Sequence, residues 1–290
     1  MSNLQTNRVS PIRTAHAQGT PEWHRVRLGN VTGSETENTY LDISQAAQYS
    51  AIRELLGVKS ITAKVKETQE FLDLFKMNPF ELFEKAEMKP PESAKRELYR
   101  KTRVAERITG LPSNPEGIFA TYAMKWGVAN ESLAIAKYKM KTGNIVKPAP
   151  FLLHPTLRVG ASPDGEVIER YTGLVGVLEV KCLATHNHLY DIIKGKEVPE
   201  RFLVQIHTEM WISGTDFCDF VGFDPRLPGK LEIFIKRVHR DDKYLDETLI
   251  PNVTRFLDEV DREEKYFRMM PRISKEQEKL LYSKKEALNV

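Results

Sequence analysis

Two acidic residues and a lysine in the second half of the chain are spaced so that they could bind a metal ion together. Asp164 lies just before one β-type segment, and Glu179 and Lys181 lie two residues apart on the next. Because side chains alternate along a β-strand, Glu179 and Lys181 should share one face while Val180 points into the core. If the two segments pair as a hairpin, Asp164 approaches Glu179.

This cluster has the composition of a hydrolytic metal site. Two carboxylates and a backbone carbonyl, here that of Val180, provide hard oxygen ligands for Mg²⁺, with Mn²⁺ as an alternative. Such an ion holds a phosphate, lowers the pKa of a bound water and neutralises charge on a leaving oxygen. Lys181 would orient or deprotonate the attacking water, or offset the growing negative charge. The residues alone therefore favour a metal-dependent phosphodiesterase that holds nucleic acid by its backbone phosphates.

A simpler interpretation of the same pattern is a turn aspartate followed by a solvated strand face. The segment from Leu174 to Val180 is mostly apolar, however. A glutamate or a lysine in a buried strand rarely lacks a partner or a function. We therefore favour the catalytic interpretation.

The elements that would position these residues are short β-type runs that begin near residue 150. We predict a turn at Thr172-Gly173 and strands at 151–153, 165–170, 174–180, 217–223 and 231–238. Helices are predicted at 20–28 after the N-cap Thr20, from Ser34 with Glu37 as a capping box, over much of 42–109, and at 117–142, 199–213 and 241–268. Helices that flank a central sheet define an α/β (α+β) fold.

Composition sets the class of protein. The 290 residues have an ordinary apolar fraction of 41%, and 43 basic against 40 acidic residues leave a net charge of +3. No segment predicts a membrane span. Cys182 and Cys218 are too few for a disulfide framework or an iron–sulfur site, and we expect two buried thiols and a protein of the reducing cytoplasm. The predicted organisation is a flexible arm at 1–19, one domain at 20–268 with a helical insertion at about 45–117, and a charged tail at 269–290.

Four ordered blocks between Trp23 and about Phe256 resemble the lambda-type exonucleases and the wider YqaJ-like viral recombinase family, a branch of the PD-(D/E)xK nucleases. The blocks are Trp23–Gly29 with Thr32–Ser34, Trp126-Gly127 with Glu131, Ser162–Gly165 with Glu179–Lys181, and Gln205–Ile212 with Phe223–Arg226. The resemblance implies a restriction-endonuclease-like core, with a central mixed sheet flanked by helices and an N-terminal helical elaboration.

The resemblance also implies roles for individual residues. Glu131 would be a third acid at the metal site, beside Asp164, Glu179 and the Val180 carbonyl. Residues expected to contact the DNA or its 5′ phosphate are Arg27, Ser34, Ser162 and Gln205. Without the resemblance, Ser34 would be only an N-cap, and Arg27, Glu131 and Gln205 ordinary polar residues of helices.

The chain also departs from the family pattern. His154 stands ten residues before Asp164, where the lambda enzyme carries an aspartate, and His207 replaces a glutamine of the fourth block. The helical section between Ser34 and Glu131 is longer than in the lambda enzyme. Its basic segment, Lys95 to Arg107, would either line DNA or form a solvated helix face balanced by acidic neighbours.

The implied activity is that of a 5′-to-3′ exonuclease that degrades the 5′-phosphorylated strand of linear double-stranded DNA and leaves 3′ single-stranded tails for phage-type recombination. Implied partners are double-stranded DNA ends, further copies of the chain in a ring of trimer type, and a single-strand annealing protein. A sequence- or structure-specific endonuclease with the same core and a non-catalytic DNA-binding scaffold are the alternatives.

Overall fold

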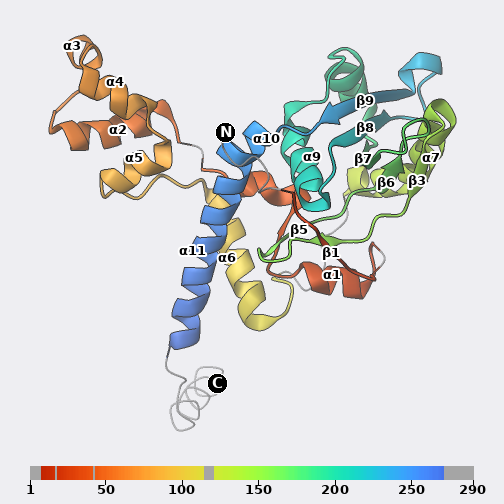
Figure 1. Cartoon of the computed structure of the whole chain (residues 1–290), viewed down its shortest axis with the longest axis horizontal. Coiled ribbons are helices and arrows are strands. Elements are labelled where there is room, and N and C mark those ends of the chain that lie inside the picture. The colour runs from red at the N-terminus through yellow and green to blue at the C-terminus, as the bar shows by residue number, and fades with distance from the viewer. Residues whose placement is uncertain (1–7, 17, 42, 114–120, 271–290) are drawn as a thin grey trace, which may run out of the picture.

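Two mixed β-sheets form the centre of the computed structural model, which describes residues 8–16, 18–41, 43–113 and 121–270 (Figure 1). The larger sheet has the order β3-β6-β7-β8-β9, with strands β3 (Ile145–Lys147), β6 (Gly165–Ile168), β7 (Val175–Lys181), β8 (Phe217–Phe223) and β9 (Ile233–His239). Only the β7–β8 pair in it is parallel. The predicted α/β fold with a mixed sheet flanked by helices is confirmed.

Of the smaller sheet, only the strand at 151–153 was predicted, and the sheet itself was not. Its order is β1-β4-β5-β2, with β1 (Ile12–Arg13), β4 (Leu152–Leu153), β5 (Val159–Ala161) and β2 (Val31–Thr32). Strands of two or three residues are too short to show an alternating pattern. This sheet joins the N-terminal segment to the segment just before Asp164, because β2 pairs in parallel with β5.

Two helices cover opposite faces of the larger sheet. Helix α7 (Tyr122–Thr142) packs Ala134 and Tyr138 against a cluster that includes Leu178 and Val180 of β7. Helix α9 (Glu200–Ser213) packs Ile206 and Met210 against the other face, where Val177 lies. Strand β7 therefore alternates between two faces, and the other side chains of its α9 face are the exposed Val175 at its start and Glu179 and Lys181 at its end. Between β7 and α9 run the short helices α8 (Thr185–Asn187) and η2 (His188–Ile193).

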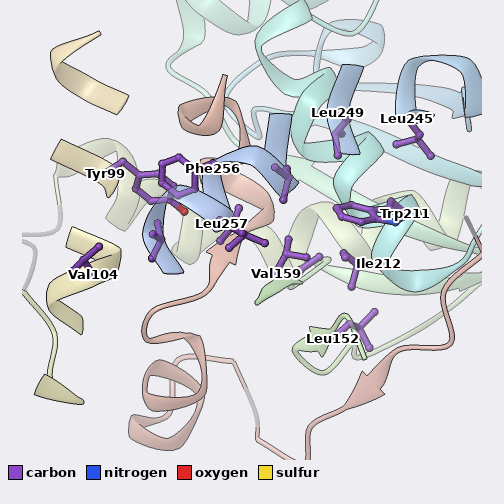
Figure 2. Close-up of a cluster of buried hydrophobic side chains, with 14 residues drawn as sticks. Tyr99, Val104, Leu152, Val159, Trp211, Ile212, Leu245, Leu249, Phe256 and Leu257 are labelled. Atoms are coloured by element: carbon purple, nitrogen blue, oxygen red, sulfur yellow. The ribbon is translucent and has the colours of Figure 1, made fainter. Parts of the chain in front are cut away.

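A third apolar cluster ties the small sheet to the C-terminal helices (Figure 2). After η3 (Gly229–Leu231) and β9, the chain forms α10 (Asp242–Tyr244), the π-helical η4 (Leu245–Leu249) and α11 (Ile250–Met269). The Tyr99 ring of α6 (Ala94–Thr109) stacks on Phe256 of α11 with 5.3 Å between centroids. The same cluster contains Trp211 of α9, so α6 belongs to the body of the domain.

The other helices of the predicted insertion form a unit with its own core. They are α2 (Gln45–Leu56), α3 (Ala63–Lys66), α4 (Gln69–Lys76) and α5 (Pro79–Lys85). Ile52, Phe71, Leu82 and Phe83 are among the buried side chains of this core. Figure 1 shows the unit at one end of the molecule, away from the sheets. The predicted helical section is therefore two parts, of which only α2–α5 stands apart.

The two lysines of the basic segment of α6, Lys95 and Lys101, lie on a solvated face, and Lys101 pairs with Glu97 as expected. Its four arginines form neither a DNA-lining surface nor a solvated face. The side chains of Arg96, Arg100, Arg103 and Arg107 are almost completely buried. Arg96 binds Glu259 of α11 at 2.8 Å and also pairs with Glu92. Arg100 and Arg107 likewise form ion pairs with acidic residues of α11. Arg103 instead pairs with Glu106 and donates to the Asn30 carbonyl. These tertiary contacts were not visible in the sequence.

Near the N-terminus, one predicted helix cap is right and one is wrong. Helix α1 (Pro21–Arg27) begins at Thr20, whose hydroxyl accepts a hydrogen bond from the Trp23 amide. Ser34 is not an N-cap, because the next element, the 3₁₀-helix η1 (Gly33–Thr39), begins after Thr32. The Ser34 side chain therefore has no capping role, and the residue lines a cavity that also contains Asp164 and Glu179.

Part of the predicted flexible arm has a defined course. Strand β1 pairs with β4, and Arg8 binds Asp216 at 2.5 Å, so residues 8–16 lie along the body of the domain. Residues 1–7 of the arm, residues 271–290 of the predicted tail and the first residues of the helix predicted from 117 lie outside the described residues. Among the described helices, none is long and apolar enough to cross a bilayer. The Cys182 and Cys218 thiols are free and buried, as expected.

Candidate active site

The β6–β7 hairpin brings Asp164 to Glu179, as predicted. Gly165 pairs with Leu178 in the antiparallel ladder, and the Asp164 amide donates to the Leu178 carbonyl at 3.0 Å. The Asp164 carboxylate then accepts a hydrogen bond from the Val180 amide at 2.7 Å. The side chain of Asp164 therefore continues the ladder beyond the end of β6. In an extended strand the N–H and C=O of one residue point to the same side, so the Val180 carbonyl faces the Asp164 side of β7.

Glu179 and Lys181 lie together on the α9 face of β7. Their side chains form an ion pair with 2.5 Å between Nζ and Oε1, and Glu179 is only 1% exposed. Burial alone would lower the pKa of Lys181, but the charge of Glu179 outweighs it and the pKa is raised. Lys181 is therefore a cation at neutral pH, which favours charge stabilisation over proton abstraction as its role.

Gln205 of α9 contacts both members of this ion pair. Its amide nitrogen donates to Glu179 Oε1 at 2.7 Å, and its carbonyl oxygen accepts from Lys181 Nζ at 3.2 Å. The orientation of the amide is thus defined by two partners of opposite chemistry. The residue that the sequence placed at the site by resemblance alone contacts both members of the Glu-x-Lys pair.

Glu209 is a further acid of the site that the sequence analysis missed. It lies one helical turn after Gln205, whose amide nitrogen donates to Glu209 Oε1 at 2.9 Å, and it is 1% exposed. The signal that could have found it is the i, i+4 spacing from Gln205, which places the two side chains on one face of the helix. Burial and the nearby charge of Glu179 raise the pKa of Glu209 well above its usual range.

Glu131 of α7 approaches the cluster from the other side. It lines a cavity of about 470 Å³ together with Asp164. Burial, and then the charge of Glu179, raises the pKa of Glu131, and burial with the charges of Glu179 and Glu131 raises that of Asp164. Several carboxylates are therefore close enough to disfavour one another's ionisation.

The residues predicted to bind phosphate lie across a second cavity, of about 230 Å³, from these acids. Ser162 accepts a hydrogen bond from the indole nitrogen of Trp23 at 3.3 Å, and the Arg27 guanidinium lies 4.0 Å from the centre of the Trp23 ring. Described residues that line this cavity are Gln18, Trp23, Arg27, Gly33, Ser34, Ser162, Asp164, Glu179, Lys181, Gln205 and Glu209. All predicted site residues except Glu131 and Val180 thus line this cavity.

His154 lies elsewhere. Its Nδ1 accepts hydrogen bonds from the amides of Thr156 and Leu157, at 3.2 and 3.0 Å, and its ring lies 5.3 Å from that of Trp211. It borders neither cavity. The histidine at the position of the family's aspartate therefore holds the turn between β4 and β5.

The donor set of the site fits a hard divalent cation. In the part of the chain that the structure describes, no three His, Cys, Asp or Glu side chains form a ready-made metal-binding group. Glu179 Oε2 and Glu209 Oε2 are nevertheless buried carboxylate oxygens without a hydrogen-bond partner among the described residues. Buried, unpaired carboxylate oxygens are costly unless a proton or a cation compensates them. Oxygen donors of this kind are the ligands that Mg²⁺ and Mn²⁺ prefer.

A mixed sheet with an aspartate before one strand and a Glu-x-Lys pair on the next is the arrangement expected of a PD-(D/E)xK nuclease. Residues 22–216 match the YqaJ-like viral recombinase domain, and the chain belongs to this family. The resemblance seen in the sequence is confirmed.

Solved structures agree with the family. The chain is similar to the crystal structure of an alkaline exonuclease, LHK-Exo, from Laribacter hongkongensis, with 27% identity and a TM-score of 0.61 over 86% of this chain and 96% of that one. The crystal structure of LHK-Exo in complex with dAMP gives 28% identity and a TM-score of 0.60 over the same shares. A comparison with curated proteins finds no match. The family and these structures support a nuclease.

Proposed function

We propose that the chain is a divalent-metal-dependent exodeoxyribonuclease that degrades the 5′-phosphorylated strand of linear double-stranded DNA in the 5′-to-3′ direction. The observation that carries the proposal is the composition of the 230 Å³ cavity. On one side lie Asp164, Glu179 and Lys181, which suit phosphodiester hydrolysis. On the other lies Arg27 with Ser34 and Ser162, which suit an anionic DNA end.

The acids would hold the cation. Asp164, Glu179, the Val180 carbonyl and Glu131 are its proposed ligands, with Mg²⁺ preferred and Mn²⁺ as a substitute. When bound, a divalent cation activates water and stabilises charge on phosphate oxygens. Burial and then the charges of neighbouring carboxylates raise the pKa values of Asp164 and Glu131. These shifts support the proposal, because a bound cation would favour the ionised carboxylates.

Lys181 would stabilise the negative charge that develops on the scissile phosphate. Its ammonium group is held by Glu179 and Gln205, and this fixed position lets it act without reorganisation during the reaction. Gln205 would position both side chains. Because the pKa of Lys181 is raised, we propose a charged lysine rather than a general base.

Arg27 would select the DNA end. Its guanidinium lies over the Trp23 ring and 5.5 Å from the centre of the Phe151 ring, so aromatic contacts define its place in the cavity. Burial lowers the pKa of Arg27, although the group remains charged, and a partly desolvated guanidinium binds a phosphate strongly. A 5′-terminal phosphate would contact the Arg27 guanidinium and the hydroxyls of Ser34 and Ser162.

A strand-resolved degradation assay with Mg²⁺ tests the proposal. The substrates are linear duplexes with a 5′ phosphate, linear duplexes with a 5′ hydroxyl, and closed circles. We expect loss of the phosphorylated strand alone, with intact circles. Nicked or linearised circles would instead indicate the endonuclease alternative. Binding of DNA ends without cleavage in Mg²⁺ or Mn²⁺ would indicate the non-catalytic scaffold.

We also propose the partners that the family resemblance implies. Double-stranded DNA ends would be the substrate, a ring-shaped homo-oligomer of trimer type the active form, and a single-strand annealing protein the recipient of the 3′ tail. Recombination in the cytoplasm of a bacterium or phage-infected cell would be the setting, which suits two free, buried thiols. Light scattering of the full chain, with and without duplex DNA, tests the oligomer; a monomer under both conditions would contradict it.

A further inference from the structure

Glu209 is a buried acid inside the 230 Å³ cavity, and none of the roles above uses it. It is 1% exposed, on the last turns of α9. Its Oε1 accepts a hydrogen bond from Gln205 at 2.9 Å, whereas its Oε2 is buried and has no hydrogen-bond partner among the described residues. One oxygen of this buried carboxylate therefore has no hydrogen-bond partner among the described residues, which is costly in a folded protein.

Glu179 shows the same pattern beside it. One amide nitrogen of Gln205 donates to both acids, at 2.7 Å to Glu179 Oε1 and at 2.9 Å to Glu209 Oε1. Within the described part of the chain, Glu179 Oε2 is also buried and unpartnered. The two carboxylates thus each direct one oxygen to a protein donor and leave the other one free.

Local positive charge does not balance these acids. The Lys181 ammonium contacts Glu179 Oε1 at 2.5 Å, on the oxygen that already has a partner. Three carboxylates, those of Asp164, Glu179 and Glu209, border this cavity with two cations, Lys181 and Arg27. The Arg27 guanidinium lies over the Trp23 ring, across the cavity from the acids. A further cation with a preference for hard oxygen would remove the imbalance.

A purely structural role for Glu209 would not require a carboxylate. If its task were to orient the Gln205 amide, any acceptor in place of Oε1 would serve, and a negative charge buried beside Glu179 would only destabilise the fold. A glutamine at this position would then be the better residue. A carboxyl group at this position, with one buried oxygen that lacks a hydrogen-bond partner among the described residues, indicates a cationic ligand.

We propose that Glu209 is a further carboxylate of the divalent-cation site, acting from α9 through Oε2 beside Glu179 Oε2. The proposal rests on the proposed function in one respect, namely that this cavity binds a divalent cation. It extends the ligand set beyond the residues of the hairpin and α7, and it assigns a task to the i, i+4 pair of Gln205 and Glu209.

Titration of the full chain with Mn²⁺ alone, without DNA, tests the proposal by calorimetry. Glu209→Gln preserves the shape of the side chain and an acceptor for Gln205 but removes the charge. We expect its Mn²⁺ affinity to fall by about tenfold or more. Glu200→Gln, an exposed change of the same kind on the same helix, should leave the affinity unchanged. Equal Mn²⁺ affinity in Glu209→Gln and the wild type would overturn the proposal.

Thermal unfolding provides a second readout. In chelator, Glu209→Gln should unfold no earlier than the wild type, because it relieves repulsion with Glu179, and Mn²⁺ should raise its unfolding temperature less. If the glutamine variant does not fold, Glu209→Ala is titrated instead, with the same loss expected and wild-type affinity as the contrary result. A wild type that binds no Mn²⁺ and degrades no DNA would refute the proposed function; normal Mn²⁺ binding and degradation with an unaffected Glu209→Gln would refute only the role of Glu209.

Discussion

Lys181 is placed by three contacts that differ in kind. It forms an ion pair with Glu179, donates a hydrogen bond to Gln205, and its Nζ lies 5.3 Å from the centre of the Phe202 ring. The side chain is 24% exposed, which leaves part of the ammonium facing the cavity. A cation held in this way can stabilise charge on a bound phosphate without first being reoriented.

Lys181→Ala should therefore abolish most cleavage and preserve binding. We expect turnover to fall by about 100-fold or more, the scale of losing one preorganised charge partner, with duplex-end affinity little changed. Single-turnover degradation and fluorescence anisotropy measure the two quantities. Lys139→Ala, an exposed lysine in the last turn of α7, is the control. Undiminished turnover in Lys181→Ala would refute the assignment of this cavity as the active site.

Arg27 should govern the preference for the DNA end. Removing one charged hydrogen-bonding partner of a phosphate costs about 1.5 to 3 kcal/mol, or roughly tenfold or more in the ratio of rates on 5′-phosphate and 5′-hydroxyl ends. In Arg27→Ala this ratio should decrease, mainly because degradation of the 5′-phosphorylated substrate becomes slower. Arg25→Ala on the same helix is exposed and should keep it. An equal loss on both ends would contradict the phosphate role.

At the scale of elements, β7 places the acid and the lysine because both of its faces are covered. Leu178 and Val180 pack under α7, while Val177 packs under α9, so a shift of the strand by one residue would bury the charged pair in an apolar cluster. The register with β6 and β8 is therefore strongly specified. The same register brings the Val180 amide to Asp164.

Helices α6 and α11 depend on buried ion pairs in a way that a stability measurement can detect. Glu92 and Glu259 share two arginines, Arg96 and Arg100. Arg96→Met would remove one of them and leave the Thr39 carbonyl without its donor, and we expect the free energy of unfolding to fall by about 3 kcal/mol. Urea denaturation followed by circular dichroism measures the change.

The control for this variant lies on the same helix. Lys101 pairs with Glu97 at 2.7 Å, but both side chains are exposed, and Lys101→Met should cost much less than Arg96→Met. A similar, small loss for Arg96→Met and Lys101→Met would show that the buried pairs add nothing beyond a surface contact.

The whole molecule should show the carboxylate cluster in its response to pH. The pKa of Asp164 is raised in the folded chain, so between its unfolded pKa, about 4, and its folded value the native state binds more protons than the unfolded state. Stability in chelator should consequently fall as pH rises through this window, the opposite of the usual behaviour of an ion-paired carboxylate. Thermal unfolding across about pH 4 to 8 measures the slope.

Asp164→Asn should reduce this slope, because it removes one of the titrating groups and keeps an acceptor for the Val180 amide. Asp258→Asn, an exposed aspartate of α11, should leave the slope unchanged. Excess Mg²⁺ should flatten the wild-type dependence, since a cation that binds the ionised form stabilises the native state at higher pH. A slope that is identical in Asp164→Asn and the wild type would contradict titration of the Asp164 carboxyl as its cause.

Much of the site is encoded locally. The alternation of β7 correctly placed Glu179 and Lys181 on one face and Val180 in the core, and the turn at Thr172-Gly173 correctly predicted the hairpin that carries Asp164. These features depend on the period of a strand and on turn chemistry, both of which act between neighbours along the chain. The helices α7 and α9 and the strand β8 were predictable for the same reason.

Tertiary structure decided the features that depend on contacts between distant segments. Glu209 became a site residue only because α9 packs over β7, His154 was excluded because its ring holds a local turn, and Arg96 was buried because α6 meets α11. The burial and the ion pairing of a side chain depend on the segment that packs against it, so they cannot be inferred from its own segment alone. By itself the sequence determined which residues could do the chemistry; packing decided which of them share a cavity and which additional acid joins them there.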